Sequence, residues 1–429
     1  MINFLNNLFK LKKETFKDKA NFKELVSNKQ IQVLFKSFNT YSDEAEIRFV
    51  GGCVRKLIND EIVDDIDLST NLEPEIVIEI LKKNNINFYA TGIDHGTVTA
   101  VINKKSFEIT SLRKDVKTDG RHAQVEYTKN WLEDASRRDF TINAIYADID
   151  GNLFDPFNGK KDLDDGLIKF IGDPTKRIKE DYLRILRYLR FFLGYSRNHQ
   201  HDKNTIKIIK QNLNGLKRVS KDRQLQELKK IISIESFNKI NSDKISKELF
   251  LLIFPELKYT NKINKLDKLS NNILRKKSFA FILSLLLIDK KSEDCDYFIY
   301  KYNLSNKEKD KILLLNLIFS EDKIKDYFTK EYLLKVLQKN GKDNLIDILD
   351  YKILTTKKNK NYLIDLKNHF IEFEVPVMPV KAKDLIDRFD LKEGKLLGSI
   401  LKEIEEQWLN NNFKISNDQI EDIVNSKRI

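Results

Sequence analysis

Glycine and proline divide this 429-residue chain into two parts with different patterns. Nine of the fourteen glycines lie between Gly51 and Gly172, among short runs rich in β-branched residues. From Pro255 to Pro376 there is no intervening proline and one glycine, while Leu, Ile and Phe recur every three or four residues, as in amphipathic helices. The sequence therefore predicts an α+β part followed by an all-helical part.

Three apolar runs in the first part are typical of strands in a mixed sheet: Ile47–Val50, Thr97–Ile102 and Phe107–Leu112. A chain of this length is long for one compact domain and predicts two to four. We expect five segments: an N-terminal helical extension at 1–29, an α+β domain at 30–170, and helical segments at 171–240, 241–356 and 357–429.

Charge and cysteine content narrow the partners and the compartment. The chain has 77 Lys and Arg residues against 65 Asp and Glu residues, which gives a net charge of +12. This charge favours binding to a polyanion such as RNA, DNA or an acidic membrane. The alternative is a lysine-rich composition without a binding role. Cys53 and Cys295 indicate neither a disulfide framework nor a zinc site, which fits a reducing cytoplasm. The apolar run Phe279–Ile288 is too short to cross a bilayer, so we expect no membrane partner.

A double glycine follows the first predicted strand. Gly51 and Gly52 lead from that strand into a helical pattern that ends near Asn59. Glycine permits close backbone approach and a helix N-terminus offers free N–H groups to an anion, while Arg55 could add a guanidinium contact to a triphosphate. A simple turn is the alternative, and by itself this pattern does not decide between the two.

Two aspartates with alternate spacing come next. On a strand, Asp65 and Asp67 would point to one face, where two like charges need a cation. Mg²⁺ accepts one or two carboxylates together with substrate phosphates. Glu108, on the neighbouring apolar strand, is the candidate third carboxylate of a catalytic site, or else a cross-strand charge. Aspartates facing solvent are the structural alternative, which the adjacent glycine turn disfavours.

Several segments together resemble the class II tRNA nucleotidyltransferases and their sister bacterial poly(A) polymerases. The resemblance covers most of Arg48 to Phe192, with Lys56 in place of a usual aspartate and Asn59-Asp60 in place of a usual glycine. The matching segments, in the family's order, are Gly51-Gly52-x-Val54-Arg55, Asp65-x-Asp67-Leu68-Ser69-Thr70, Arg137 to Ala144, Asp155-Pro156-Phe157-x-Gly159 and Glu180-Asp181-x-x-Arg184.

This resemblance implies a polymerase β-like nucleotidyltransferase head with a mixed sheet, followed by an all-α neck, body and tail. It implies Mg²⁺ at Asp65 and Asp67, and a phosphate or ribose contact from Arg138. Asp139 could accept a hydrogen bond from a ribose 2′-hydroxyl, and the structural alternative is a buried Arg–Asp pair within Arg137 to Asp139. The implied nucleotide-binding set is Gly51, Gly52, Arg55, Arg138, Asp139, Asn143, Glu180, Asp181, Arg184, Arg187 and Arg190.

A helix opened by Asp173 and Pro174 is expected to read the base. Asp181 offers acceptors and Arg184 donors, which complement the amino group and ring nitrogen of cytosine and adenine and clash with uracil and guanine. The resemblance implies the same selection, with Glu180 orienting Arg184. A face of solvated salt bridges is the structural alternative. On the opposite arc, the expected core residues are Tyr182, Ile185, Leu186, Leu189 and Phe192.

Two further stretches bear on RNA. Residues 113–128 read as a polar hairpin with a turn at Asp119-Gly120, and in relatives a loop here helps to switch the site from C to A. Basic residues at Lys217, Arg218, Arg223 and 229–230 could contact an acceptor RNA or simply be solvated. His199 and His201 read as surface residues rather than metal ligands.

We therefore expect a CCA-adding enzyme that transfers C, C and A from CTP and ATP to the tRNA 3′ end with Mg²⁺. A poly(A) polymerase shares the head chemistry but tends to carry a basic pair where this chain has Ile93, Asp94 and His95 after Gly92. The sequence also leaves open a partial enzyme that adds only A or only CC, and a catalytically silent RNA-binding protein.

Overall fold

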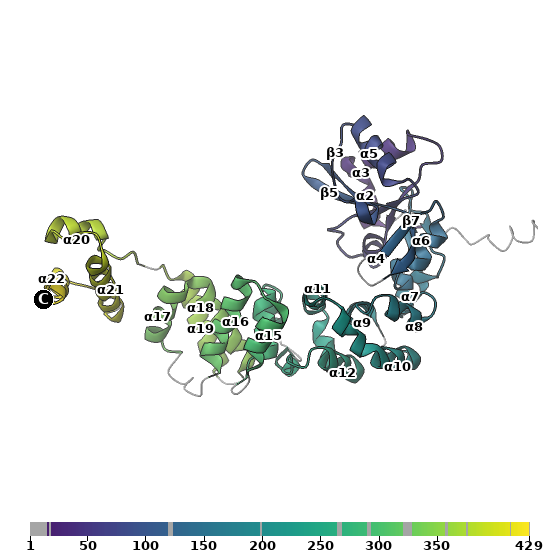
Figure 1. Cartoon of the computed structure of the whole chain (residues 1–429). Helices are drawn as coiled ribbons and strands as arrows, with labels where there is room; N and C mark the ends of the chain where they lie inside the picture. Colours follow the sequence, from purple (N-terminus) through teal and green to yellow (C-terminus); the bar gives the residue numbers. More distant parts are fainter. Residues whose placement is uncertain are drawn as a thin grey trace, which may run out of the picture. The chain divides into compact units, whose positions relative to one another are not determined.

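The computed structural model describes residues 15–428 apart from 17–18, 119–122, 198–199, 264–267, 290–292, 321–327, 357–358, 375 and 412. The chain divides into two compact units, Met1–Ile253 and Phe254–Ile429 (Figure 1). The finer five-segment division stays a prediction. The Asp119-Gly120 turn, His199 and the first fourteen residues of the predicted N-terminal extension lie outside the described residues.

A seven-stranded sheet organises the first unit, in the order β3-β4-β5-β2-β1-β8-β9. The three predicted strands are confirmed, two of them with the expected bounds, so the α+β fold class is correct. The strands are β1 Ile47–Val50, β2 Asp67–Thr70, β3 Asn87–Gly92, β4 Thr97–Ile102, β5 Lys105–Ser111, β8 Tyr146–Ala147 and β9 Leu153–Phe154, while β6 Arg113–Thr118 and β7 Ala123–Tyr127 form a separate hairpin.

One pairing among the described strands is parallel, and it sets the site. β2 runs parallel to β5, with Asp67 opposite Glu108 in the register. The other described pairings of the sheet are antiparallel. The strand begins at Asp67, so Asp65 lies in the segment before it. The expectation that both aspartates sit on a strand is therefore wrong for Asp65, because the backbone still bends at that residue.

Helices of the first unit cover the sheet and continue beyond it. Asn28 caps α3 by accepting from the Gln30 N–H, and Phe35 of that helix packs on Phe49 of β1. The helical elements are α2 Ala20–Ser27, α3 Lys29–Asn39, α4 Gly52–Ile58, α5 Pro74–Lys83, η1 Ile93–His95, α6 Trp131–Arg137, η2 Thr141–Asn143, α7 Gly159–Asp165, α8 Pro174–Glu180, α9 Arg184–Tyr195, α10 Lys203–Asn212, η3 Leu213–Arg218, α11 Lys221–Ser233, η4 Phe237–Asn241 and α12 Lys244–Ile253.

The predicted base-reading helix is two helices. Asp173 caps α8 and Pro174 occupies its first turn, as expected, but the helix ends at Glu180 and Asp181 is extended. The Asp181 carboxylate accepts from the Leu183 N–H, and this local bond replaces a helical one. In α9 the expected core residues Ile185, Leu186, Leu189 and Phe192 are buried, whereas Tyr182, before it, is half-buried.

The side chain of His201 is buried in this unit rather than lying on its surface. Its ring stacks on Phe192 with centroids 3.5 Å apart, and its two nitrogens contact the Tyr188 hydroxyl and the Asp243 carboxylate at 3.0 and 2.8 Å. The prediction of a surface residue was wrong, because the side chain joins α9 to the segment before α12. That the two histidines do not form a metal site stays a prediction, because His199 lies outside the described residues.

The second unit is helical where it is described, as the proline-free stretch predicted. Its last three helices bury a small core of their own around Ile400, Ile404 and Val424. The elements are η5 Thr260–Ile263, α13 Lys268–Leu274, α14 Phe279–Leu287, α15 Asp294–Tyr302, α16 Asn306–Phe319, α17 Lys330–Asn340, α18 Lys342–Thr355, α19 Lys360–Glu372, α20 Ala382–Phe389, α21 Lys395–Asn410 and α22 Asn417–Arg428.

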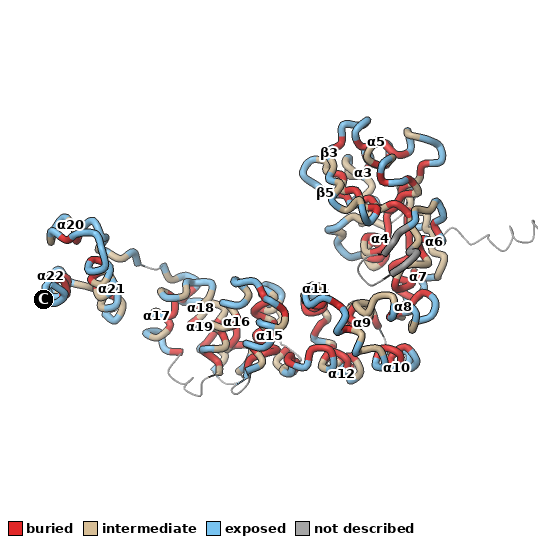
Figure 2. Tube along the Cα trace, viewed as in Figure 1, coloured by how far each residue is buried: buried red, intermediate tan, exposed pale blue. Residues whose placement is uncertain are grey.

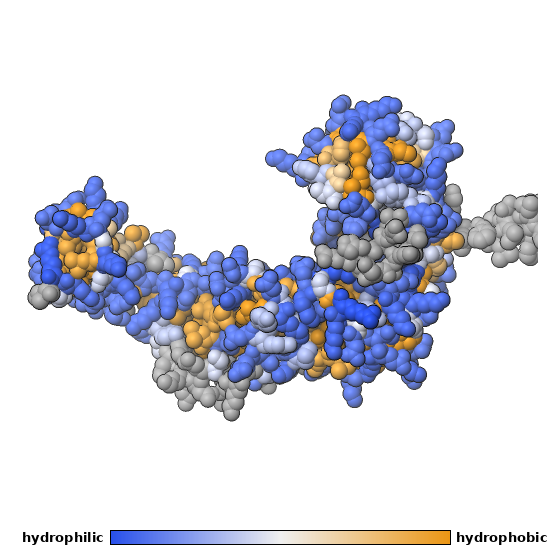
Figure 3. Space-filling view, in the orientation of Figure 1, coloured by the Kyte–Doolittle hydropathy of each residue, from blue (hydrophilic) through white to orange (hydrophobic). Residues whose placement is uncertain are grey.

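Buried and exposed residues alternate along most of these helices (Figure 2), whereas α14 is buried over most of its length. On the face shown in Figure 3 hydrophilic side chains dominate, in keeping with the 33% charged residues of the chain. Cys53 and Cys295 are both free and buried. None of the described helices has the length and apolar composition that a membrane crossing requires.

Candidate nucleotide-binding site

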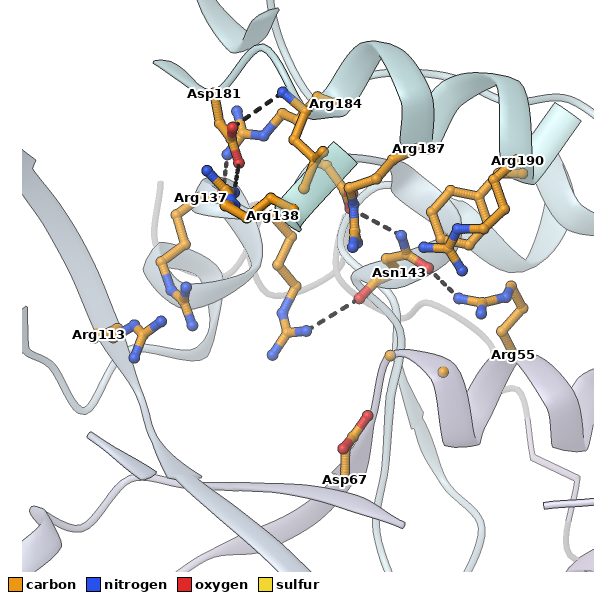
Figure 4. A pocket seen from close by; sticks show the side chains of 16 residues that line it. Arg55, Asp67, Arg113, Arg137, Arg138, Asn143, Asp181, Arg184, Arg187 and Arg190 are labelled. Atoms are coloured by element: carbon orange, nitrogen blue, oxygen red, sulfur yellow. Dashed lines mark hydrogen bonds and ion pairs between the residues drawn. The ribbon is translucent and has the colours of Figure 1, made fainter. Parts of the chain in front are cut away.

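A cavity of about 550 Å³ opens in the first unit where β1, α4, β2 and α9 meet. Eight of its sixteen lining residues are arginine, against three aspartates, so it is suited to a polyanion. Figure 4 shows most of these side chains directed into one space. The lining residues are Gly51, Gly52, Arg55, Asp67, Arg113, Arg137, Arg138, Asp139, Asn143, Asp181, Leu183, Arg184, Arg187, Arg190, Phe191 and Arg223.

Most of the site residues predicted from the sequence meet in this cavity. The exceptions are Asp65, Glu108 and Glu180, which do not line it. The sequence interpretation gave no nucleotide-binding role to Arg113, Arg137, Leu183, Phe191 or Arg223. Of these, Arg137 and Arg223 stood inside recognised segments, and that position was the available signal. Phe191 and Leu183 carry no signal that separates them from core residues.

The glycine turn brings the backbone close to the cavity wall. Gly51 has φ +63°, a conformation that side chains rarely adopt, and a Cβ built there would lie 3.4 Å from Nη1 of Arg138. The Gly51 carbonyl accepts from the Arg55 N–H, which starts α4. The predicted strand, glycine turn and helix are therefore present, and the turn leaves room for a group bound between Gly51 and Arg138.

Three carboxylates form one electrostatic cluster at the edge of the cavity. Burial, then the charges of Asp65 and Glu108, raise the pKa of Asp67 to about 6, against the lowering effect of Arg138 and Arg55. Because like charges repel, Asp67 in its ionised form favours a cation beside it. The donor set is oxygen only, which Mg²⁺ prefers, and two carboxylates with substrate phosphates suffice for it. No group of three or more metal-binding side chains is arranged as a complete site within the described residues.

Arg138 is held in place from behind. Its Nε donates to the Tyr146 hydroxyl at 2.9 Å, and its Nη2 lies 3.1 Å from the Asp134 carboxylate, which Arg137 also contacts at 2.7 Å. Burial would raise the pKa of Asp134, but Arg138 and Arg137 hold it well below its usual range. A fixed guanidinium with Nη atoms facing the cavity is suited to a phosphate or ribose oxygen.

Asp139 links two more arginines. Its Oδ2 accepts from Nε of Arg187 at 2.5 Å, and its Oδ1 accepts from Nδ2 of Asn143 at 2.8 Å. The Asn143 Oδ1 in turn accepts from Arg55. Burial would raise the pKa of Asp139, but Arg187 and Asn143 lower it to about 2. The buried-pair alternative is thus present, with Arg187 of α9 as the partner rather than a neighbour in sequence.

The predicted base-reading pair lies at the junction of α8 and α9. Glu180 accepts from Nη1 of Arg184 at 2.6 Å, and Nη2 of Arg184 donates to the Arg137 carbonyl at 3.3 Å. Asp181 accepts from Nη2 of Arg223 at 2.7 Å. Glu180 thus contacts Arg184 directly, while its role in orienting Arg184 stays a prediction.

The hairpin formed by β6 and β7 begins at the cavity. Arg113 lines the cavity, its N–H lies 3.4 Å from the Asp134 carboxylate, and it pairs with Tyr127 across the hairpin. The Tyr127 hydroxyl donates to the Ile93 carbonyl at 3.4 Å. The predicted hairpin is therefore confirmed, and its base is tied both to the site and to the turn before β4.

Comparisons with known proteins find relatives along most of the chain. A model of the poly A polymerase head domain matches residues 47–169. The human mitochondrial CCA tRNA nucleotidyltransferase 1 is 32% identical over 387 residues, which are 87% of this chain and 85% of that protein. The CCA-adding enzyme of Lactobacillus helveticus is 30% identical over 398 residues, covering 88% and 92%.

Solved structures share the fold at lower identity. The CCA-adding enzyme of Bacillus stearothermophilus in complex with CTP has a TM-score of 0.69 at 22% identity, covering 96% of this chain and 98% of that one. That of Thermotoga maritima, complexed with tRNA, has a TM-score of 0.62 at 20% identity, covering 94% and 98%. With relatives above 30% identity along most of both lengths, this chain belongs to the family of CCA tRNA nucleotidyltransferases, the CCA-adding enzymes.

Proposed function

We propose that this chain adds C, C and A in turn to the 3′ end of tRNA, with CTP and ATP as substrates. The observation that carries the proposal is a single arginine-lined cavity with Asp67 on one wall and Asp181 with Arg184 on another. Asp67 would supply the catalytic charge, and Asp181 with Arg184 would supply the hydrogen-bonding groups that face the base. The similarity to CCA-adding enzymes along most of the chain supports the same reaction.

In the reaction, the tRNA 3′-hydroxyl oxygen attacks the α-phosphorus of the nucleotide, the bond to the β-phosphate oxygen breaks, and pyrophosphate leaves. Asp65 and Asp67 would hold Mg²⁺, which when bound would polarise the reacting oxygens and offset the phosphate charge. At neutral pH the Asp67 carboxyl, with its pKa of about 6, is mostly ionised and able to bind a cation. Glu108 would add charge to this cluster.

The arginines orient the rest of the nucleotide. Arg138, fixed by Asp134 and Tyr146, presents donors to a phosphate or ribose oxygen next to Gly51. Because both oxygens of Asp139 already accept from Asn143 and Arg187, its support for ribose binding would act through these partners. The remaining nucleotide contacts would come from Arg55, Arg187 and Arg190.

Base selection would come from Asp181 and Arg184. Arg184 is anchored by Glu180 and by two backbone carbonyls, so its remaining N–H groups have a fixed direction. Asp181 retains lone pairs beyond those used by Arg223 and Leu183. Together they would accept an amino N–H and donate to a ring nitrogen, the pattern shared by cytosine and adenine.

Complete CCA addition is the form of the activity that we favour, because the β6–β7 hairpin is present and its base reaches the cavity through Arg113. The basic side chains of α11 and the preceding turn would meet the RNA backbone. The two free, buried cysteines support a reducing compartment such as the cytoplasm.

The test supplies the purified protein with Mg²⁺ and tRNA that lacks its 3′ end, together with CTP, ATP or both. We expect two C residues with CTP alone and a complete CCA end with both nucleotides. Failure to add C from CTP would overturn the proposal, and long tails from ATP on unrelated RNA would replace it with a poly(A) polymerase.

Variants separate chemistry from binding. Asp65→Ala and Asp67→Asn should abolish addition while the affinity for tRNA stays unchanged. Asp64→Asn is the matched control, because this exposed neighbour pairs with Lys56 and does not line the cavity. Equal activity of Asp67→Asn and the wild type would contradict the assigned role.

A further inference from the structure

A phenylalanine lies among the arginines of the cavity. Phe191 belongs to α9, lines the cavity and has 2% of its surface exposed. The central guanidinium carbons of Arg190, Arg55 and Arg187 lie 4.2, 4.7 and 5.5 Å from its ring centroid. All three are within the range of a cation–π contact. One aromatic ring therefore contacts three cations that come from two helices.

The polar contacts of these arginines leave the group positively charged. Arg187 pairs with Asp139, Arg190 with Glu227, and Arg55 donates to the neutral amide of Asn143. Two carboxylates thus serve three guanidinium groups. Arg55 is 6% exposed, and its Nε has no hydrogen-bond partner among the described residues. A buried donor and an excess positive charge in a cavity both favour an anionic ligand.

The three guanidinium groups repel one another, so another group must hold them together before an anionic ligand binds. Burial, and the charges of Arg187 and Arg55, lower the pKa of Arg190 although Glu227 opposes this. The face of an aromatic ring carries negative potential and attracts cations most strongly where water is excluded. The ring itself is fixed by Phe140, at a centroid distance of 5.5 Å.

We propose that Phe191 is a positioning residue whose ring holds Arg55, Arg187 and Arg190 as one cationic cluster that receives the triphosphate of the incoming nucleotide. The inference rests on the proposed function and deepens it. Because the cluster would bind phosphates rather than a base, its effect should be the same for CTP and ATP. The choice between bases would stay with Asp181 and Arg184.

The test measures dissociation constants for CTP, ATP and inorganic tripolyphosphate by calorimetry, without RNA. Phe191→Leu should weaken all three by about tenfold, the scale of a desolvated cation–π contact. Phe191→Tyr keeps the aromatic face and should bind within about twofold of the wild type. Phe192→Leu is the control, because it removes a buried ring from the same helix that does not line the cavity.

A shape-preserving variant guards against misfolding. Replacing Phe191 with a phenylalanine fluorinated around its ring keeps the volume but cancels the negative potential of the face, and should weaken tripolyphosphate binding as Phe191→Leu does. Unchanged binding in this variant would overturn the inference, as would binding by folded Phe191→Leu equal to that by Phe192→Leu. Loss of affinity for one nucleotide but not for tripolyphosphate would overturn it too.

Failure of the inference and failure of the proposed function are distinguishable. If wild-type protein adds C to tRNA while the Phe191 variants bind tripolyphosphate normally, the role of Phe191 is refuted and the function stands. If wild-type protein adds no nucleotide at all, the function is refuted, whatever the Phe191 variants bind. In assays of addition, KM for CTP and for ATP should rise by the same factor in Phe191→Leu.

Discussion

Asp139 joins the nucleotide-binding arginines to the fold, and replacing it tests how far the site depends on that link. Its Oδ2 accepts from Arg187 at 2.5 Å and its Oδ1 accepts from Asn143 at 2.8 Å. Asp139→Asn keeps the size of the side chain but removes its charge. One carboxylate oxygen is then replaced by an NH₂ group. At Oδ2 this donor would face the Arg187 donor, and at Oδ1 it would face the N–H groups of Asn143 and the Phe140 backbone.

The magnitude follows from the ionisation of this carboxyl. Lowering the pKa of Asp139 from 3.8 to about 2 corresponds to about 2.5 kcal/mol of stability. Breaking a buried ion pair by removing one partner costs about 3–5 kcal/mol. Since the Arg187 side chain is 31% exposed, solvent offsets part of that cost. We therefore expect Asp139→Asn to lose about 3 kcal/mol at pH 7.

The sign of the pH dependence is also set. An aspartate with a lowered pKa in the folded state stabilises fully above its unfolded pKa of 3.8, and this stabilisation is lost as pH falls through about 2. The difference in unfolding free energy between the wild type and Asp139→Asn should therefore be constant from about pH 8 to about pH 5 and shrink between about pH 4 and about pH 2.

The assay uses the two tryptophans of the chain, Trp131 in the first unit and Trp408 in the second. In a Trp408→Phe background, urea unfolding followed by fluorescence reports the first unit alone. Asp162→Asn is the control, because Asp162 is a buried aspartate that contacts Thr141 and does not line the cavity. This substitution should lower the free energy of unfolding but leave the affinity for CTP unchanged. A loss below about 1 kcal/mol for Asp139→Asn, or a difference independent of pH, would refute the reasoning.

Three further substitutions test separate parts of the site. Glu108→Gln removes a charge that raises the pKa of Asp67, so the acid limb of the pH–rate profile should move to lower pH, and an unmoved limb would contradict this. Glu180→Gln loosens Arg184, so competition assays should show lower incorporation of C and A and detectable incorporation of U or G. Gly96→Ala would place a Cβ 2.9 Å from the ring of Tyr127 in the hairpin, at a residue whose φ is +73°. Addition of A should therefore fall more than addition of CC, and equal losses would count against a role for the hairpin base.

Local signals in the sequence were sufficient for the strands and the glycine turn. Ile47–Val50 and Thr97–Ile102 are short apolar runs flanked by polar or glycine residues, and the structure has them with those bounds. The break at Asp181 was not predictable from periodicity, because the spacing of buried residues continues on either side of it. A carboxylate that accepts from Leu183 ends the helix there, and such a bond leaves no trace in a hydrophobic pattern.

Tertiary pairing decided the rest of the site. Glu108 could be proposed from the sequence as a third carboxylate, but only the parallel register of β2 and β5 places it opposite Asp67. The partner of Asp139 was expected among neighbouring residues and is Arg187, 48 positions away. Phe191 reads as one more apolar residue of an amphipathic helix, and only its three guanidinium neighbours distinguish it from the core.

The same helix serves both ends of the proposed substrate. Arg184, Arg187 and Arg190 are spaced three residues apart on α9, so each begins about 4.5 Å further along the helix axis than the last. The first lies beside Asp181, which would read the base, and the last two contact Phe191, which would gather the phosphate-binding cations. Glu180, Asp139 and Glu227 bind these arginines, one each. A rigid helix held in this way fixes the distance between base and triphosphate contacts. The protein could then select a nucleotide by its edge without a nucleic-acid template.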